Sequence, residues 1–230
     1  IFPTYGLHPW YAEQYQVEDM LPFIEKGAML GEIGMDSIWW DVSMKRQNEV
    51  FVEQLILAEK MGLPIVLHTK GQEKEILECI QPFSIPILVH WYSCADYLQG
   101  YIEKDCYFTV GPDVFDNPAV QAVVDKVNLN RLLVETDGFS AVQWAMDQYA
   151  KVGTFLENNK ESIIEKENTI KTENDKKTDS DIVTLEKLSE ILWSIMEYIA
   201  SVKKVTLEEV SNQMELNFKF LNYYRIRNER

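Results

Sequence analysis

The chain has 230 residues, 46% of them hydrophobic, and a formal net charge of −15 at pH 7. This length suits one large domain, since barrels of alternating strands and helices commonly occupy roughly 200–250 residues, and no apolar run reaches the roughly 18 residues that span a bilayer. The negative charge argues against stable binding of duplex DNA, so a phosphate-containing substrate must be small, or bound cations must attract it locally.

Short apolar segments alternate with longer amphipathic ones up to residue 136. Strands are predicted at residues 1–6, 28–34, 64–68, 86–90, 107–111 and 131–136. Helices are predicted at residues 17–26, 47–61, 73–80, 95–104 and 118–127. The strands are nearly continuous apolar runs, which is typical of parallel strands covered on both faces. The alternation predicts an α/β fold with right-handed crossovers, and a closed barrel and a doubly wound open sheet both satisfy it.

The pattern changes after residue 136. Residues 156–183 are rich in Glu, Lys, Asn, Asp and Thr and predict a polar, solvent-exposed insertion. Residues 185–202 are amphipathic and predict a helix, and Thr206 with Glu209 predicts a capping box that opens a last helix. We expect residues 1–230 to form one domain with the insertion placed before these last helices.

Three cysteines, Cys79, Cys94 and Cys106, show none of the paired spacing of a zinc knuckle. An odd set of thiols argues against a disulfide framework and favours a reducing compartment. We expect them to be small buried residues in a cytoplasmic protein.

The candidate chemistry lies at the carboxyl ends of the predicted strands, which form the functional rim of parallel α/β folds. The histidines His8, His68 and His90 all follow such an end, and so do the carboxylates of Glu32 and Asp137. A lone histidine more often satisfies a hydrogen bond, and Asp137 by itself could be a helix N-cap. Together, however, two histidines and two carboxylates offer the mixed nitrogen and oxygen ligation of catalytic zinc or manganese.

Five short motifs in chain order resemble the signature segments of TatD-family hydrolases. They are GLHP at 6–9, GEIGMD at 31–36, PIVLH at 64–68, HWYS at 90–93 and ETD at 135–137. The closing residues 206–221, with Asn217, resemble that family's last helix. The resemblance spans nearly the whole chain and implies a TIM-type (β/α) barrel that holds one or two divalent ions (Zn, Mg or Mn).

The resemblance also implies roles for individual residues. Glu32 resembles a carboxylate that can bridge two metals, and His68 and His90 resemble the pair that holds one ion. Asp137 is similar to the ligand that also orients the attacking water, so Glu32 and Asp137 are the candidate catalytic groups.

On the substrate side, His8 resembles the family's histidine, and Lys70 stands where an arginine is frequent. Lysine lacks the guanidinium fork and holds phosphate less directionally. Trp10 and Tyr92 are further candidates for substrate binding, although most aromatic residues near the motifs are expected to pack between the loops and the barrel.

Two departures from the family pattern bear on these expectations. Residues 138–140 replace a proline-containing turn, and the His-x-His pair of the family's first strand is absent. We therefore expect that the barrel here lacks its first strand and that the natural protein carries an additional N-terminal strand with that pair.

The family's best-known activity is metal-dependent cleavage of DNA from the 3′ end. We expect a divalent-metal-dependent hydrolase of phosphodiester bonds, acting on a phosphate-containing small molecule or on the end of a single DNA strand. One alternative is an amidohydrolase-like enzyme that cleaves an amide or a lactone, since the barrel serves both chemistries. The other is a non-catalytic binding protein on a decayed barrel.

Overall fold

The structure is a computed structural model that describes residues 2–24, 28–148 and 185–224. The strands are β1 (Thr4–Tyr5), β2 (Met29–Asp36), β3 (Ile65–Lys70), β4 (Ile87–His90), β5 (Tyr107–Val110) and β6 (Leu132–Val134). The α-helices are α1 (Val17–Ile24), α2 (Met44–Met61), α3 (Glu73–Ile80), α4 (Leu98–Glu103), α5 (Pro118–Lys126), α6 (Gly138–Gln148), α8 (Leu185–Lys203) and α9 (Leu207–Asn222). Short 3-10 helices lie at Pro9–Tyr11, Pro112–Phe115 and Leu129–Arg131.

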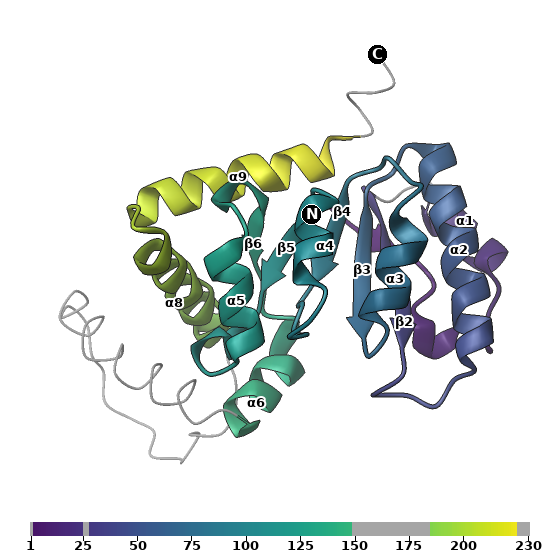
Figure 1. Cartoon of the computed structure of the whole chain (residues 1–230), viewed down its shortest axis with the longest axis horizontal. Coiled ribbons are helices and arrows are strands. Elements are labelled where there is room, and N and C mark those ends of the chain that lie inside the picture. Colours follow the sequence, from purple (N-terminus) through teal and green to yellow (C-terminus); the bar gives the residue numbers. More distant parts are fainter. Residues whose placement is uncertain (1, 25–27, 149–184, 225–230) are drawn as a thin grey trace, which may run out of the picture.

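The strands form one parallel sheet in which the spatial order is the chain order, β1-β2-β3-β4-β5-β6. Strands β2 to β6 follow one another across the view in Figure 1. A doubly wound sheet reverses its strand order part of the way through, whereas a barrel does not. The α/β fold with barrel-type winding is therefore confirmed and the doubly wound alternative is excluded. Within the described residues β1 and β6 each pair with one neighbour, so this sheet is open.

The two faces of the sheet bury different side chains. Leu67, Val89 and Phe108 are fully buried on the face that the crossover helices cover. Their neighbours Val66 and Leu88 point to the opposite, inner face, because successive side chains of a strand alternate. These inner residues line a cavity of about 210 Å³ together with His90, Glu135 and Asp137, which lie at or beyond the carboxyl ends of their strands.

Helix α9 crosses the amino ends of the strands, on the side away from these carboxyl ends (Figure 1). Its first turn has the capping box predicted from Thr206 and Glu209. The Asn217 amide donates to the backbone carbonyls of Leu129 and Leu132, at 3.1 and 2.8 Å, where β6 begins. Helix α9 therefore covers the amino end of the sheet, and the candidate functional residues lie at the carboxyl end.

Helix α6 is an addition to the expected elements, because no helix is predicted for residues 138–148. Gly138 has a left-handed φ of 82° and starts the helix, and Val142 and Ala145 bury its inner face. The predicted polar insertion at 156–183 lies outside the described residues. None of the described helices is long and apolar enough to cross a lipid bilayer.

Candidate metal centre

His68 and His90 lie side by side because of strand register. In the ladder between β3 and β4, His68 is the direct partner of His90. Directly paired residues of neighbouring strands project to the same face. Both imidazoles are largely buried on the inner face, 7% and 9% exposed.

A β-bulge brings Glu32 to these histidines. Between Leu30 and Ile33, β2 carries one residue more than its partner strand β3, and such an insertion re-aims side chains. The flanking glycines permit the close contact of the two strands. A Cβ on Gly31 would lie 2.6 Å from the Val66 Cβ, and one on Gly34 would lie 2.0 Å from the His68 carbonyl oxygen.

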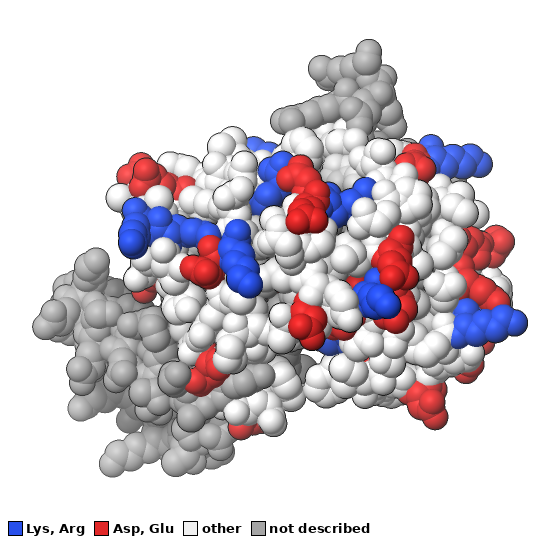
Figure 2. Space-filling model, viewed as in Figure 1, with Lys and Arg blue, Asp and Glu red and all other residues white. Residues whose placement is uncertain are grey.

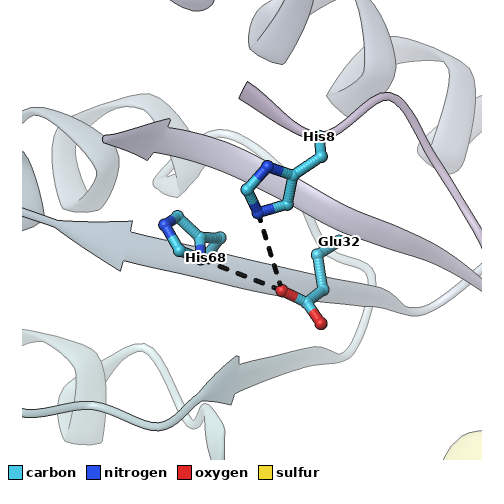
Figure 3. Close-up of side chains that lie close together, drawn as sticks. All are labelled: His8, Glu32 and His68. Carbon is cyan, nitrogen blue, oxygen red and sulfur yellow. Dashed lines mark ion pairs between the residues drawn. The ribbon is translucent and has the colours of Figure 1, made fainter. Parts of the chain in front are cut away.

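A single carboxylate oxygen faces all three imidazoles. Glu32 Oε2 lies 3.9 Å from His8 Nε2, 3.8 Å from His68 Nδ1 and 3.9 Å from His90 Nε2. Figure 3 shows two of these contacts, from His8 and His68, meeting at that oxygen. The distances are too long for hydrogen bonds. They suit a shared ion, because two ligands at ~2.1 Å from a metal can lie up to ~4.2 Å apart.

Two groups of ligand atoms result, and Glu32 belongs to both. One is His8, Glu32 and His68, and the other is Glu32, His90 and Asp137, with the ligand atoms of each group within 4.8 Å of one another. The second group is completed by a 3.8 Å contact between His90 Nε2 and Asp137 Oδ2. The structure thus brings together Glu32, His68, His90 and Asp137. His68 and His90, which were expected to hold the same ion, belong to different groups.

Each buried histidine is held by a second carboxylate. Asp36 Oδ2 lies 2.8 Å from His68 Nε2, and Glu135 Oε2 lies 2.6 Å from His90 Nδ1. In each ring the remaining nitrogen faces Glu32, which is the arrangement that orients histidine ligands in metal enzymes. Neither Asp36 nor Glu135 was assigned a role from the sequence. Asp36 is the last residue of β2, and Glu135 directly follows β6. The reasoning from strand ends that selected Glu32 and Asp137 therefore applies to these two carboxylates as well.

These contacts shift the ionisation of the site. Burial alone would lower the pKa of His90, but the Glu135 carboxylate outweighs it and raises that pKa to about 9. Burial also favours protonation of Asp36, yet hydrogen bonds from His68, Trp10 and two backbone N–H groups keep its pKa well below the ordinary range. Burial raises the pKa of Asp137 although His90 opposes the shift. Asp137 also adopts a left-handed φ of 54°, which is uncommon outside glycine.

His8 differs from the other two histidines. Burial and the nearby His68 lower the pKa of His8 to about 3, so its ring is neutral at pH 7. Its Nδ1 accepts the Trp10 backbone N–H at 3.3 Å, which places the proton of the neutral ring on Nε2. In that tautomer Nε2 carries a proton that it can donate to a substrate, as expected for a histidine on the substrate side, and it would act as a metal ligand only if the proton moved to Nδ1.

Of the other predicted substrate-binding residues, Lys70 and Trp10 lie at the site and Tyr92 lies in the core. Lys70 Nζ donates to Ser93 Oγ at 2.8 Å, and burial lowers the pKa of this lysine. The Trp10 indole donates to Asp36 Oδ2 at 2.7 Å and is thus tied to the centre. Tyr92 is not at the site, which corrects the expectation. It is 1% exposed and its hydroxyl donates to the Asp96 carbonyl, because the chain turns inward after β4 at the left-handed Trp91 (φ 39°).

A parallel β/α sheet in barrel order, with histidine and carboxylate ligands converging at its carboxyl end, defines the class of metal-dependent barrel hydrolases. The sequence profile of the TatD-related DNases matches residues 1–222, and the chain belongs to this family.

Individual relatives agree with this assignment. An uncharacterized metal-dependent hydrolase of Methanocaldococcus jannaschii is 32% identical over 144 residues, which cover 60% of this chain and 57% of that protein. The 3′–5′ ssDNA/RNA exonuclease TatD of Enterobacter lignolyticus is 28% identical over 146 residues, covering 58% of this chain and 56% of that protein. The chain therefore spans a little more than half of the length of these curated relatives.

Solved structures support the fold. A hydrolase of the TatD family from Entamoeba histolytica superimposes with a TM-score of 0.69 at 17% identity, covering 96% of this chain and 74% of that one.

Proposed function

We propose that the protein is a divalent-metal-dependent phosphodiesterase that removes nucleotides from the 3′ end of single-stranded DNA or RNA. The observation that carries this proposal is the Glu32 oxygen that lies 3.8–3.9 Å from nitrogens of three imidazoles. The polarity and the single-stranded substrate come from the exonuclease relative in Enterobacter lignolyticus. The three unpaired cysteines suit a reducing compartment, and we place the activity in the cytoplasm.

The donor set indicates which ions would bind. Two groups that share Glu32 offer places for two ions, one beside His68 and one beside His90 and Asp137. Imidazole nitrogen combined with carboxylate oxygen favours Zn²⁺ or Mn²⁺ over Mg²⁺, which prefers all-oxygen ligation.

A divalent ion held by these residues would lower the pKa of a coordinated water towards ~7 and would offset negative charge on the phosphate. Asp137 accepts the proton of the attacking water. His8 donates from Nε2 to a phosphate oxygen, and Lys70 adds positive charge at the rim.

The cavity suits the end of a strand. Its volume of about 210 Å³ is lined by Glu32, His90, Glu135 and Asp137, among other residues of the inner face. A space of this size admits a phosphate and part of a sugar, and it is too small for a continuous duplex. This volume supports hydrolysis at the free end of a single strand.

The test is a cleavage assay on a 5′-labelled single strand, with the protein loaded with Mn²⁺ or Zn²⁺. We expect progressive shortening from the 3′ end, much slower shortening of a blunt duplex, and no product with excess chelator. Turnover of an amide or lactone substrate without any action on the oligonucleotide would establish the amidohydrolase alternative. Stoichiometric metal binding with no turnover of any of these substrates would establish the binding-protein alternative.

A further inference from the structure

Two rows of aromatic rings lead from the metal centre to solvent. In one row the Trp10 ring lies 6.1 Å from His68, and Trp40 stacks on Trp10 at 5.5 Å with an interplanar angle of 20°. In the other row Trp91 lies 6.3 Å from His90, Trp144 lies 6.1 Å from Trp91, and Trp39 lies 6.0 Å from Trp144. The consecutive residues Trp39 and Trp40 thus end different rows.

The rings that end the two rows, Trp39 and Trp40, are exposed, although tryptophan side chains are on average largely buried. Trp40 is 55% exposed and Trp39 is 50% exposed, on the loop between β2 and α2. Asp36, the carboxylate that holds His68, also holds this loop. Its Oδ1 accepts the backbone N–H groups of Ile38 and Trp39, both at 2.8 Å. The other oxygen of Asp36 holds Trp10 and His68. One carboxylate therefore sets the position of both the imidazole and the exposed rings.

The geometry of the two rows differs. Within the Trp91–Trp144–Trp39 row the rings meet edge to face, at 76° and 82°. Trp10 and Trp40 are nearly parallel, so a flat ring placed on the outer face of Trp40 would continue their stack. A stacked strand rises ~3.4 Å per nucleotide along its axis, so two ring-to-ring steps from His68 correspond to a few nucleotides.

The net charge argues against the usual means of holding a single strand. With a net charge of −15, a basic groove that tracks the backbone is not the expected means of binding. On the face shown in Figure 2, lysine and arginine side chains lie in separate spots among acidic ones. We propose that Trp40 is a substrate-binding residue whose exposed ring stacks on a nucleobase near the 3′ end of a single strand. This inference rests on the proposed nuclease function and adds the site that recognises a base.

The test is the affinity of metal-loaded protein for a short, 5′-labelled oligodeoxyadenylate with phosphorothioate linkages at its 3′ end, which resist cleavage. Fluorescence anisotropy should show that Trp40→Ala binds about 5- to 150-fold more weakly than wild type, which corresponds to ~1–3 kcal/mol for one stacked base. Trp40→Phe retains a ring and should recover most of the affinity. Trp193→Ala is the matched control, because this tryptophan is also 50% exposed but lies on α8.

A second oligonucleotide separates stacking from other contacts. When the terminal bases are replaced by abasic sites, wild type and Trp40→Ala should bind with equal affinity. Cleavage of unmodified oligonucleotide by the wild type, with no loss of binding in Trp40→Ala, would overturn this inference and leave the proposed function standing. No binding and no cleavage by the wild type would overturn both. Trp40-dependent binding to neutral lipid vesicles, with oligonucleotide binding unaffected by the substitution, would assign the exposed rings to a membrane surface instead.

Discussion

At the scale of single residues, the four carboxylates of the site form two pairs that contact the histidines differently. Glu32 and Asp137 face imidazole nitrogens across gaps of 3.8–3.9 Å, whereas Asp36 and Glu135 make short hydrogen bonds to the far side of the same rings. The first pair is positioned to touch an ion, and the second pair to hold its ligands. This division predicts different losses when each carboxylate is replaced by its amide.

Asp137→Asn should leave the fold intact and lower kcat about 10²- to 10⁴-fold, the range for removal of a general base. The amide cannot accept the proton of water, and it balances less of the metal's charge. Steady-state kinetics on the oligonucleotide, with a thermal melt for folding, provides the measurement. Asp147→Asn, an exposed position further along α6, is the control and should retain wild-type turnover. Wild-type kcat in Asp137→Asn would remove this residue from the mechanism.

Asp36→Asn and Glu135→Gln should each weaken metal binding about 10- to 100-fold, because the histidine they orient loses a charged partner. Competition with a chromophoric chelator measures this affinity directly, without any substrate. Asp105→Asn serves as the control, since Asp105 pairs with Arg131 where β6 begins. Equal metal affinity in all four proteins would show that neither carboxylate positions a ligand.

The sequence predicts the candidate ligands but not the residues that hold them. Glu32, His68, His90 and Asp137 are candidates because each lies at or near the carboxyl end of a predicted strand, and parallel strands end on one side of the sheet. In the structure Glu32 lies within β2, at the bulge, and reaches the histidines from there. Tyr92 was misplaced, because the backbone turn at Trp91 depends on packing that no local pattern reports. The hydrogen bond from Trp10 to Asp36 joins residues 26 apart in sequence, and only the fold shows it.

At the scale of elements, the bulged strand β2 depends on two close contacts with β3. Gly34 has a φ of 148°, and an added Cβ would lie 2.0 Å from the His68 carbonyl oxygen. Gly62 is also left-handed, with a φ of 62°, but an added Cβ would meet nothing within 4 Å. Replacement of Gly62 therefore tests backbone conformation alone, whereas replacement of Gly34 tests a positive φ together with a strand contact.

Gly62→Ala should lower the free energy of unfolding by about 1 kcal/mol, the cost of a left-handed alanine. Gly34→Ala should lower it by roughly 3 kcal/mol or more, because a clash with the neighbouring backbone adds to the conformational cost. Chemical denaturation of both variants gives the comparison. Similar losses in the two variants would mean that β2 shifts to accommodate the methyl group, and metal affinity should then fall in Gly34→Ala.

Secondary structure followed from local signals where those signals were strong. The capping box of α9 and the amphipathic face of α2 were predicted from short patterns and are present. Helix α6 is not predicted, since its first residue, Gly138, directly follows an acidic pair and is also a typical turn residue. Its buried positions, Val142 and Ala145, pack against neighbouring elements that the pattern of residues 138–148 does not identify.

At the scale of the whole molecule, topology required more than the alternation of strands and helices. A barrel and a doubly wound sheet share that alternation, and only the sequential pairing of β1 to β6 distinguishes them. Parallel pairing carries every carboxyl strand end to the same rim, and ligands from β2, β3 and β4 and from the segment after β6 meet there in one centre. The net charge, in contrast, is a property of the entire sequence, and it constrains how substrate is held.

The net charge of −15 predicts an unusual salt dependence for oligonucleotide binding. A protein that neutralises 6–10 phosphates with lysine and arginine loses roughly 10³–10⁵ in affinity between ~50 and ~200 mM salt, because counterions are released on binding. Here metal ions, Lys70 and stacked rings would hold the strand while the rest of the surface repels it, and added salt screens that repulsion. We expect the affinity to change by less than about tenfold over the same range. Anisotropy titrations at several NaCl concentrations, with free Mn²⁺ held constant, measure the slope. A steep loss of affinity with salt would instead show that several basic side chains contact phosphates, and the stacking at Trp40 would then be a minor part of binding.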